Sequence, residues 1–281
     1  MKQRLISAFF ALLLLAGVLV FFDTPLANAV FTAVGGLCIF ESLRAYKLSG
    51  NYLLLAVFEL VHLLNMFFEP DRSALSFVVI FSMFALLVAR DGADGGFSAG
   101  AAAAMLTLTV TSGFRAMLAL RAMSPLKLDG IVLFVISIAF GLLCDSFAYF
   151  VGRFFGRHKL APVISPNKTT EGALGGIIGT SIFTALALWL YASNAPEGSV
   201  FAGMTSWLDV GIYALIGALG SMCGILGDLA MSFVKRDAGI KDFGKIMPGH
   251  GGALDRLDSV LFSCVFAQVA FGLLFASRAA M

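Results

Sequence analysis

The segment IVLFVISIAFGLLCDSFAYFVG, residues 131–152, carries a single charged side chain, Asp145. About 20 helical residues cross a hydrocarbon core about 30 Å thick, so this segment predicts a membrane-spanning helix. The composition of the whole chain agrees, because 59% of the 281 residues are hydrophobic and only 13% are charged. The apolar share of a soluble domain is usually about 45–50%. The sequence therefore predicts an integral membrane protein.

Eight further apolar runs resemble residues 131–152, and charged residues, proline or glycine bound each of them. Backbone polar groups in lipid must pair within their own segment, which favours helices over open strands. We therefore expect an all-α, polytopic integral membrane protein with about nine transmembrane helices, the first of them retained rather than cleaved as a signal sequence. The nine runs cover residues 5–22, 27–43, 52–68, 74–89, 97–114, 131–152, 172–193, 208–231 and 257–277.

The distribution of Lys and Arg predicts the orientation of these helices. With a cytoplasmic N-terminus, fourteen basic residues fall on the cytoplasmic side and five on the other. The cytoplasmic set is Lys2, Arg4, Arg44, Lys47, Arg90, Arg153, Arg157, Lys159, Lys168, Lys235, Arg236, Lys241, Lys245 and Arg256. The other set is Arg72, Arg115, Arg121, Lys127 and Arg278, and three of these weaken the prediction because they share the 115–127 connection. The bias nevertheless places the polar loops 153–171 and 232–256 in the cytoplasm.

Other classes of partner find little support in the composition. The net charge of +2 gives no indication of a nucleic-acid partner, so we expect none. The four cysteines lie one per apolar run without metal-binding spacing, and we expect them to be core thiols. The small-residue stretch SAGAAAAM, residues 98–105, permits a homodimer through close helix packing.

The stretch KRDAGIKDFGKIMPGHGGALDRLDS, residues 235–259, contains nine of the 36 charged residues of the chain. Its glycines surround His250 just before a helix, and a backbone freed of side chains can approach a phosphate closely. Asp255 and Asp258 follow three residues apart, on one face of that helix. Carboxylates beside phosphate-binding groups indicate a divalent cation, and Mg²⁺ fits best because it takes one or two protein carboxylates together with substrate phosphates and water.

Two more acids are expected at the same depth in the membrane. At about 1.5 Å per residue, Asp228 lies about 27 Å along its helix from Val210, and Asp145 lies about 21 Å from Ile131. Both positions are near the cytoplasmic ends of helices that start outside, and intramembrane carboxylates by default suggest a site. The structural alternative is that Asp255 caps its helix while Asp228 pairs with Lys235 or Arg236.

The loop GRFFGRHKLAPVISPNKTTEGALGG, residues 152–176, has the same polar character. Lys168 and the threonine hydroxyls suit a phosphate. Thr169 or Thr170 is equally well explained as the N-cap of the following helix, because Ser/Thr followed by Glu is typical of a helix start. We expect Thr170 to act mainly as such a cap. In the third run, we expect Glu59 and His62 to hydrogen-bond to each other.

Three stretches together resemble a known family. Residues 232–258, SFVKRDAGIKDFGKIMPGHGGALDRLD, are similar to the signature of the phosphatidate cytidylyltransferases, also called CDP-diacylglycerol synthases. DSFAYFVGRFFGR and SPNKTTEG resemble two further conserved stretches of that family, in the expected order. The chain departs from the family pattern at Met247 and Ala253, which bear on packing, and at Asn167 and Thr170, which bear on substrate affinity.

The resemblance implies the reaction of CTP with phosphatidate to give CDP-diacylglycerol and pyrophosphate, at the cytoplasmic face of the inner membrane and among membrane lipids. It implies that Asp228 and Asp255 hold Mg²⁺, with a second cation, monovalent or divalent, left open. The implied catalytic residues are Asp228, Asp255, Lys168 and Asp258. The implied substrate-binding residues are Asp145, Ser165, Asn167, Thr169, Glu171, Lys235, Arg236, Lys241, Asp242, His250, Gly251, Gly252 and Arg256; for His250 we favour phosphate contact over metal ligation.

We also expect a functional division of the chain, and we weigh three alternative functions. Residues 1–122 are expected to form a lipid-facing scaffold, and residues 123–281 to carry the catalytic loops. A cytidylyltransferase acting on another lipid phosphate is the nearest alternative. A transporter would place its acids nearer the midplane and would need no phosphate loop. A CDP-alcohol phosphotransferase would show a DGxxAR…GxxxDxxxD pattern, which the sequence lacks.

Overall fold

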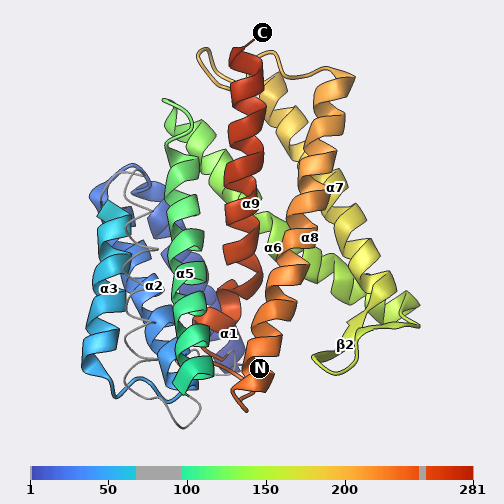
Figure 1. Cartoon of the computed structure of the whole chain (residues 1–281). Helices are drawn as coiled ribbons and strands as arrows, with labels where there is room; N and C mark the ends of the chain where they lie inside the picture. The colour runs from blue at the N-terminus through green and yellow to red at the C-terminus, as the bar shows by residue number, and fades with distance from the viewer. Residues whose placement is uncertain (1, 68–95, 247–250, 281) are drawn as a thin grey trace. The chain divides into compact units, whose positions relative to one another are not determined.

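The computed structural model describes residues 2–67, 96–246 and 251–280, and in them the chain forms helices and one short hairpin (Figure 1). The helices are α1 (Lys2–Val20), α2 (Pro25–Ala45), α3 (Tyr52–Phe67), α5 (Gly96–Arg121), α6 (Lys127–Phe155), α7 (Thr170–Ser193), α8 (Trp207–Asp237) and α9 (Leu254–Ala279). The antiparallel strands are β1 (Lys159–Ala161) and β2 (Ser165–Thr169). The hairpin is a short addition to a mostly helical chain, and the sequence analysis did not predict it.

Six of the described helices are long and apolar enough to cross a membrane: α2, α5, α6, α7, α8 and α9. α3 is apolar but has only 16 residues. The predicted run 74–89 lies outside the described residues, so the total of nine spanning helices stays a prediction. The described ranges confirm a mostly helical chain with several apolar helices of bilayer length.

Arg115 lies within α5, not in the connection where the sequence placed it. α5 continues to Arg121, so the link to α6 shrinks to residues 122–126. Arg115 Nη1 donates to the carbonyl oxygen of Asn65 at 3.1 Å, near the end of α3. One of the three basic residues that weakened the predicted topology is therefore bound within the helical part of the protein.

The chain folds as two compact units, each discontinuous in sequence. Unit 1 comprises residues 1–115 and 234–257, and unit 2 comprises residues 116–233 and 258–281. The charged stretch after α8 thus belongs to the unit of the N-terminal helices. We expected a functional division between residues 122 and 123, and the compact units do not follow it.

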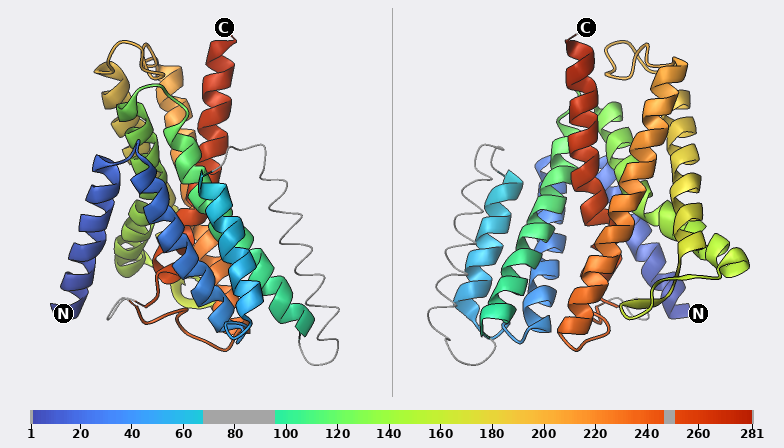
Figure 2. Two further views of the ribbon diagram at one scale, coloured as in Figure 1. Left: turned by 90° about the vertical axis from the view of Figure 1, so that its left-hand side faces the viewer. Right: turned by 45° about the vertical axis from the view of Figure 1, so that its right-hand side comes forward.

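In unit 1, α2 and α3 run side by side, coloured blue and cyan in Figure 2. Gly35 of α2 allows the close approach, because a Cβ there would overlap the His62 ring. His62 Nδ1 lies 3.3 Å from Thr111 Oγ1, and His62 Nε2 lies 3.4 Å from the Phe31 carbonyl oxygen. The expected bond between His62 and Glu59 is therefore replaced by contacts to α5 and α2.

In unit 2, helices α6 to α9 and the loop before α8 enclose an aromatic core. The ring of Phe201, from that loop, is fully buried. It meets the Tyr191 ring edge-on at 5.4 Å between centroids and the Phe275 ring at 5.3 Å. Such pairs contribute about 0.5–1.5 kcal/mol beyond their buried area, so the loop is a packed part of the fold.

Asp129, in the first turn of α6, is completely buried and is the centre of a hydrogen-bond network in unit 2. Its Oδ1 accepts hydrogen bonds from the Tyr191 hydroxyl at 2.5 Å and the Ser199 hydroxyl at 2.7 Å. Its Oδ2 accepts from the Ser124 hydroxyl at 2.6 Å and the Val200 amide at 3.0 Å. The four donors satisfy the hydrogen-bonding capacity of the buried carboxylate. They connect α6 to α7, to the loop before α8 and to the 122–126 link.

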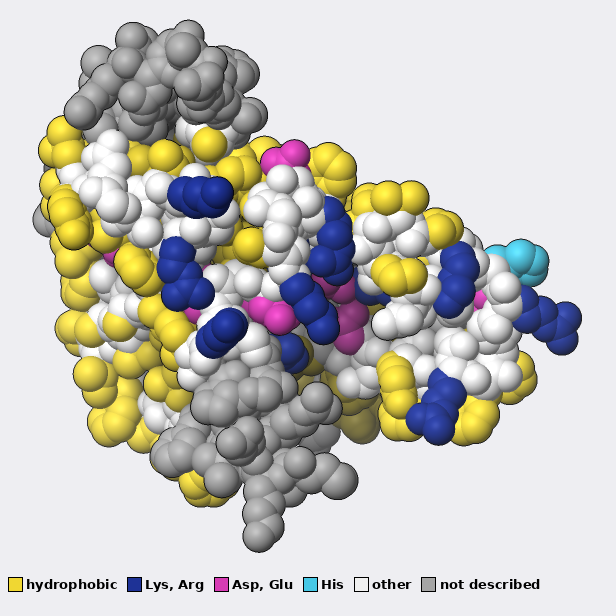
Figure 3. Space-filling model, turned by 90° about the horizontal axis from the view of Figure 1, so that it is seen from below, with side chains coloured by type: hydrophobic (Ala, Val, Ile, Leu, Met, Phe, Trp, Pro, Cys, Tyr) yellow, Lys and Arg dark blue, Asp and Glu magenta, His cyan; other side chains and the backbone are white. Residues whose placement is uncertain are grey.

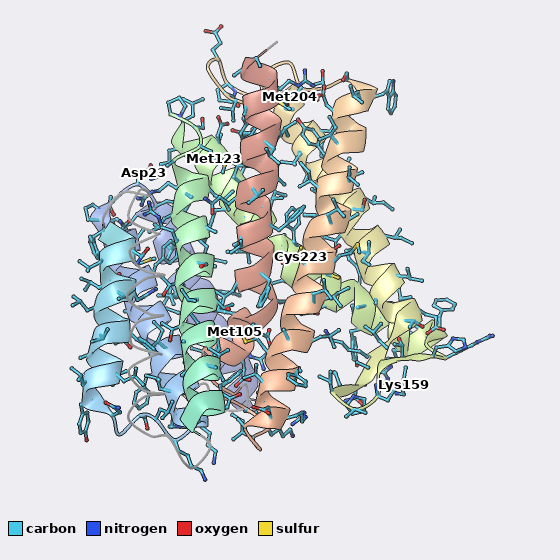
Figure 4. The ribbon with its side chains drawn as sticks, in the orientation of Figure 1. Asp23, Met105, Met123, Lys159, Met204 and Cys223 are labelled. Carbon is cyan, nitrogen blue, oxygen red and sulfur yellow. The ribbon has the colours of Figure 1, made fainter. Side chains whose placement is uncertain are left out.

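The two ends of unit 2 differ in what they carry. Met123 and Met204 mark the end with the α5–α6 and α7–α8 connections, and Lys159 marks the other end with the hairpin (Figure 4). Arg278 of α9 forms an ion pair with Asp209 of α8. This separation agrees with a topology in which the hairpin and the 122–126 link face opposite sides of a bilayer.

Candidate active site

Three helices of unit 2 cross at small residues just before the predicted acids. A Cβ on Gly141 of α6 would lie 2.8 Å from Ser259 Oγ of α9, and a Cβ on Gly224 of α8 would lie 3.4 Å from Gly141 Cα. Asp145 and Asp228 follow Gly141 and Gly224 by four residues, about one helical turn. The crossing therefore brings these two carboxylates to one level of unit 2, as the sequence predicted.

Asp258 belongs to the same crossing. A Cβ on Gly227 would lie 2.9 Å from the Asp258 carbonyl oxygen, so α8 and α9 touch directly beside Asp228. The Asp258 side chain is buried, and its Oδ1 accepts from the Ser259 amide at 2.8 Å. Three of the four predicted acids thus gather in unit 2, and the fourth, Asp255, lies in unit 1.

A cavity of about 410 Å³ in unit 2 lies beside these acids, between α6, the hairpin, α7 and α8. Its volume falls within the range of about 300–1,000 Å³ that is usual for small-molecule sites. The polar lining comprises Asp145, Arg153, Asn167, Lys168 and Thr169, and Tyr149, Leu160 and Ile225 contribute apolar surface. A cavity with both characters suits a molecule that has a phosphate and an apolar part.

Lys168, on β2, forms an ion pair with Asp228 of α8. The two side chains are 23% and 21% exposed, while the Lys168 Nζ atom itself is buried. The sequence analysis assigned both residues to catalysis but predicted no contact between them, and the structure shows that contact. Their substrate contacts stay predictions.

Thr169 is the N-cap of α7, since its Oγ1 accepts from the Gly172 amide at 3.1 Å. Our expectation that Thr170 is the cap was wrong. Thr170 is the first residue of the helix, and its amide donates to the His158 carbonyl oxygen at 3.0 Å. The two threonines were equivalent in sequence, and the extended backbone of Thr169 decides between them.

Glu171 fastens the loop after α6 to the start of α7. Its carboxylate accepts from the Arg157 amide at 3.0 Å and from the His158 amide at 3.2 Å. The His158 ring also lies against it, with 2.5 Å between Nδ1 and Oε1. The expected role of Glu171 in substrate binding stays a prediction, and the structure adds a local reason for an acid here. His158 is exposed, and this contact holds its ring.

Asp255 is the centre of polar contacts in unit 1. Lys235 Nζ lies 2.9 Å from its Oδ1, and the amides of Phe243 and Gly252 donate to its Oδ2 at 2.8 and 2.9 Å. The Lys235 and Asp255 side chains are only 10% and 4% exposed. Asp255 thus lies in the first turn of α9 and binds amides of the segment before the helix, not the first amides of α9 itself. This agrees only in part with the structural alternative weighed from the sequence, in which Asp255 caps its helix.

The partners of the acids differ from that alternative in one respect. We considered an ion pair of Asp228 with Lys235 or Arg236 on the same helix. Asp228 instead pairs with Lys168, and Lys235 pairs with Asp255. Each of the two predicted metal ligands therefore has a lysine as its partner. Contacts between distant elements decided the pairing, and spacing along α8 did not reveal them.

Four further residues of unit 1 that the sequence predicted for substrate binding are exposed. Arg236, Lys241, Asp242 and Arg256 have exposed side chains. Arg236 Nη1 donates to the Ile240 carbonyl oxygen at 3.2 Å. The exposed group is accessible to a ligand from solvent, and its role in binding stays a prediction.

The glycines of the signature have conformational and packing reasons of their own. Gly251 has a positive φ of 87°, a conformation that L side chains rarely adopt. Gly252 is buried, and a Cβ there would overlap the carboxylate of Glu41. His250 lies outside the described residues. Ser165 lies at the start of β2, partly exposed.

Charged side chains gather on the face shown in Figure 3, where Lys and Arg are dark blue and acids are magenta. Within the described ranges, no three His, Cys, Asp or Glu side chains form a group that could hold a metal ion by themselves. Asp145 and Asp228 are nevertheless hard oxygen donors beside a lysine and a cavity. Such a set fits Mg²⁺, which completes its coordination with substrate phosphates and water.

Glu41 is a residue that our sequence reading missed. It lies within α2, is 1% exposed, and its Oε2 accepts from the Leu254 amide at 3.0 Å. An acid inside an apolar run was the available signal, because intramembrane carboxylates are costly and suggest a role. Its partner is 213 residues further along the chain, and no local pattern relates the two.

Comparison with known proteins identifies the family of the chain. A model of the cytidylyltransferase family matches residues 2–274. The chain is 44% identical over 120 residues to the phosphatidate cytidylyltransferase of Staphylococcus haemolyticus (strain JCSC1435) and 43% identical to that of Staphylococcus aureus (strain COL). The identity to the enzyme of Staphylococcus epidermidis (strain ATCC 12228 / FDA PCI 1200) is 48%. These alignments cover 43% of the chain and span about two fifths, 41%, of the length of each relative.

Proposed function

Because the chain belongs to the cytidylyltransferase family, we propose that it is a phosphatidate cytidylyltransferase, which converts CTP and phosphatidate to CDP-diacylglycerol and pyrophosphate. The observation that carries the proposal is the Lys168–Asp228 ion pair beside a cavity that also contains Asp145, Asn167 and Thr169. The printed names of the relatives support the choice of lipid.

In this reaction a phosphate oxygen of phosphatidate attacks the α-phosphorus of CTP. The bond between the α-phosphorus and the bridging oxygen breaks, and pyrophosphate leaves with the electron pair. The attacking phosphate is already an anion, so the site needs no strong general base. Positioning of the two phosphates and neutralisation of their charge account for the catalysis.

The two lysines that form ion pairs with acids are suited to positioning the phosphates and neutralising their charge. Lys168 can exchange its contact with Asp228 for phosphate oxygens at the cavity. In unit 1, Lys235 can likewise exchange its contact with Asp255 for phosphate oxygens. The ion pairs hold both lysines in place before a substrate arrives. Arg153, at the cavity wall, is a further cation in reach of an anionic group there.

The carboxylates of the predicted site are suited to binding a cation. As the resemblance implies, we assign Asp228 and Asp255 to Mg²⁺, with Asp145 and Asp258 as further carboxylates and a second cation left open. When bound, Mg²⁺ would neutralise the nucleotide phosphates and stabilise the leaving pyrophosphate. The protein residues supply the oxygen ligands, and the lysines prevent unbalanced negative charge when substrate and metal are both absent.

The hairpin and the 232–256 stretch are assigned to the cytoplasmic side of the inner membrane. The basic residues of both segments support this side, and water-soluble CTP would reach them there. Phosphatidate would enter from the bilayer. The apolar lining from Tyr149, Leu160 and Ile225 is suited to the part of the lipid next to its phosphate.

The test is to incubate purified protein in detergent with CTP labelled at the α-phosphate, Mg²⁺ and a panel of lipid phosphates. We expect labelled CDP-diacylglycerol from phosphatidate, one pyrophosphate per lipid product, and loss of both with a chelator. Product from a different lipid phosphate alone would keep cytidylyl transfer and replace the lipid. A folded protein that labels no lipid phosphate would contradict the proposal and favour a transporter.

A further inference from the structure

Glu41 places a carboxylate at the start of α9 from a different part of unit 1. Its Oε2 accepts from the amide of Leu254, the first residue of α9. The first amides of a helix lack partners within the helix, and the helix start attracts negative charge. Glu41 therefore supplies from α2 what a local cap usually supplies.

The signature stretch is shaped to receive this side chain. A Cβ on Gly244 or on Gly252 would overlap the Glu41 carboxylate. The two glycines also lie close together, since a Cβ on Gly244 would be 2.9 Å from Gly252 Cα. Neither glycine has a positive φ, so backbone conformation does not explain both. Contact with Glu41 does.

Glu41 and Asp255 divide the backbone amides of this stretch between them. Asp255 Oδ2 binds the amides of Phe243 and Gly252, and Glu41 Oε2 binds the amide of Leu254. Two acids at one helix start repel each other, and Lys235, 2.9 Å from Asp255 Oδ1, offsets part of that repulsion. The position of Glu41 is thus coupled to the position of the Lys235–Asp255 pair.

A second contact fixes the same end of α2. The Tyr46 hydroxyl donates to Asp237 Oδ2 at 3.0 Å, at the end of α8. Burial and then the hydrogen bond to Asp237 raise the pKa of Tyr46 to about 12. The phenol therefore keeps its proton and donates across the physiological pH range. With Glu41 and Tyr46, α2 holds the segment between α8 and α9 at both of its ends.

Stability alone is a poor reason for an acid at this position. Glu41 Oε1 is buried and has no hydrogen-bond partner among the described residues. An unmatched buried carboxylate oxygen costs free energy that a smaller apolar side chain would not. A residue kept at such a cost, beside a predicted metal ligand, indicates a role in the site.

We propose that Glu41 is a positioning residue of the site, which sets the backbone at Gly252 and the start of α9 and so fixes the placement of Asp255 and Lys235. This inference rests on the proposed cytidylyl transfer. Misplacement of a reacting group by about 1 Å can cost about 100-fold in rate. Glu41 acts through Asp255 and Lys235 and does not itself touch the substrate.

The experiment is a double-mutant cycle of Glu41→Ala and Gly252→Ala in full-length protein in detergent. Each single variant should lower kcat with CTP and phosphatidate by about 100-fold. Gly252→Ala should cost little more once Glu41→Ala has removed the overlap, because contacting residues are not additive. Gly211→Ala is the matched control, since nothing lies within 4 Å of a Cβ at that position. It should combine additively and retain activity.

Glu41→Gln protects the test against misfolding, because it keeps the size of the side chain and an acceptor for the Leu254 amide. We expect a melting temperature and a kcat near those of the wild type, because the positioning contact is retained, in contrast to Glu41→Ala. Variants with a lower melting temperature and unchanged kcat and KM would reduce Glu41 to a structural anchor and overturn the inference. So would additive effects in the cycle. A folded wild type that transfers no cytidylyl group would instead overturn the proposed function.

Discussion

Lys168 and Asp228 form an ion pair that joins β2 to α8 at the edge of the cavity in unit 2. In the proposed reaction the lysine would bind a substrate phosphate and the carboxylate would bind a metal ion. Each neutralises the other when neither ligand is bound, so the site carries opposite charges without an unpaired ion in a partly buried place. The structure shows a similar arrangement in unit 1 with Lys235 and Asp255.

Replacing Lys168 by alanine removes a cation that we assign to a substrate phosphate. We expect kcat/KM for CTP or for phosphatidate to fall by about 100-fold, as for the loss of one transition-state donor. The loss of stability should be small, about 1 kcal/mol or less, because both partners are partly exposed. Lys159→Ala, an exposed lysine of β1, is the control. Unchanged kinetics for both substrates would remove Lys168 from the site.

The two threonines before α7 should respond differently to alanine. Thr169→Ala removes the cap of α7 and should cost about 1 kcal/mol of stability. Thr170→Ala leaves the cap and the bond from the Thr170 amide to His158 intact, so its cost should be smaller. Thermal unfolding of both variants in detergent measures the difference. A larger loss for Thr170→Ala would show that the cap is assigned to the wrong residue.

Substitutions of Asp129 should lower the stability of the protein in graded steps, without a direct effect on catalysis. Alanine abolishes all four hydrogen bonds and should cost about 3 kcal/mol or more, since buried donors lose their acceptor. Asparagine can keep its carbonyl oxygen on the Val200 amide while its amide group donates to the hydroxyls of Tyr191 and Ser199. Asp129→Asn should therefore unfold at a temperature between those of the wild type and Asp129→Ala. Equal melting temperatures for all three proteins would contradict the network.

The predicted topology can be tested by cysteine labelling of intact cells with an impermeant reagent. Lys159→Cys and Lys241→Cys should stay unlabelled, because their segments are assigned to the cytoplasm. Glu197→Cys, exposed in the loop before α8, should react from outside. The wild type, with its four native cysteines, sets the background. Ready labelling of Lys159→Cys in sealed cells would reverse the orientation.

Most of the helices could be predicted because a bilayer imposes a length and a polarity on each of them. Residues 131–152, 172–193 and 208–231 all fall within long apolar helices of the structure. The hairpin could not be predicted in the same way. Its strands have only three and five residues and show no alternating pattern, and pairing between them decides their conformation.

The acids of the candidate site were predictable as intramembrane charges, but their partners were not. Asp145, Asp228 and Asp258 stand out in apolar surroundings, and rise per residue alone gives their depth. Which lysine pairs with which acid depends on contacts between elements far apart in sequence. For the same reason Glu41 was overlooked, although it is equally conspicuous as an acid within α2.

The central claim is that Asp228 and Asp255 hold a cation that the reaction requires. Asparagine at either position keeps the size of the side chain and removes its charge. Both variants should still fold, because asparagine keeps an oxygen that can accept the hydrogen bonds of the carboxylate. Each leaves a lysine without its ion-pair partner, so the melting temperature should fall, and more for the buried Asp255 than for Asp228. Glu197→Gln, an exposed acid of the α7–α8 loop, is the matched control and should behave like the wild type.

The most direct measurement is the turnover of CTP and phosphatidate by Asp228→Asn and Asp255→Asn across a Mg²⁺ titration, together with the melting temperature of each variant. We predict well-folded proteins whose turnover is at least about 100-fold below that of the wild type and is not restored by added Mg²⁺. Near-normal turnover by either variant, with only a change in melting temperature, would contradict metal binding by that residue and leave it a helix cap or an ion-pair partner.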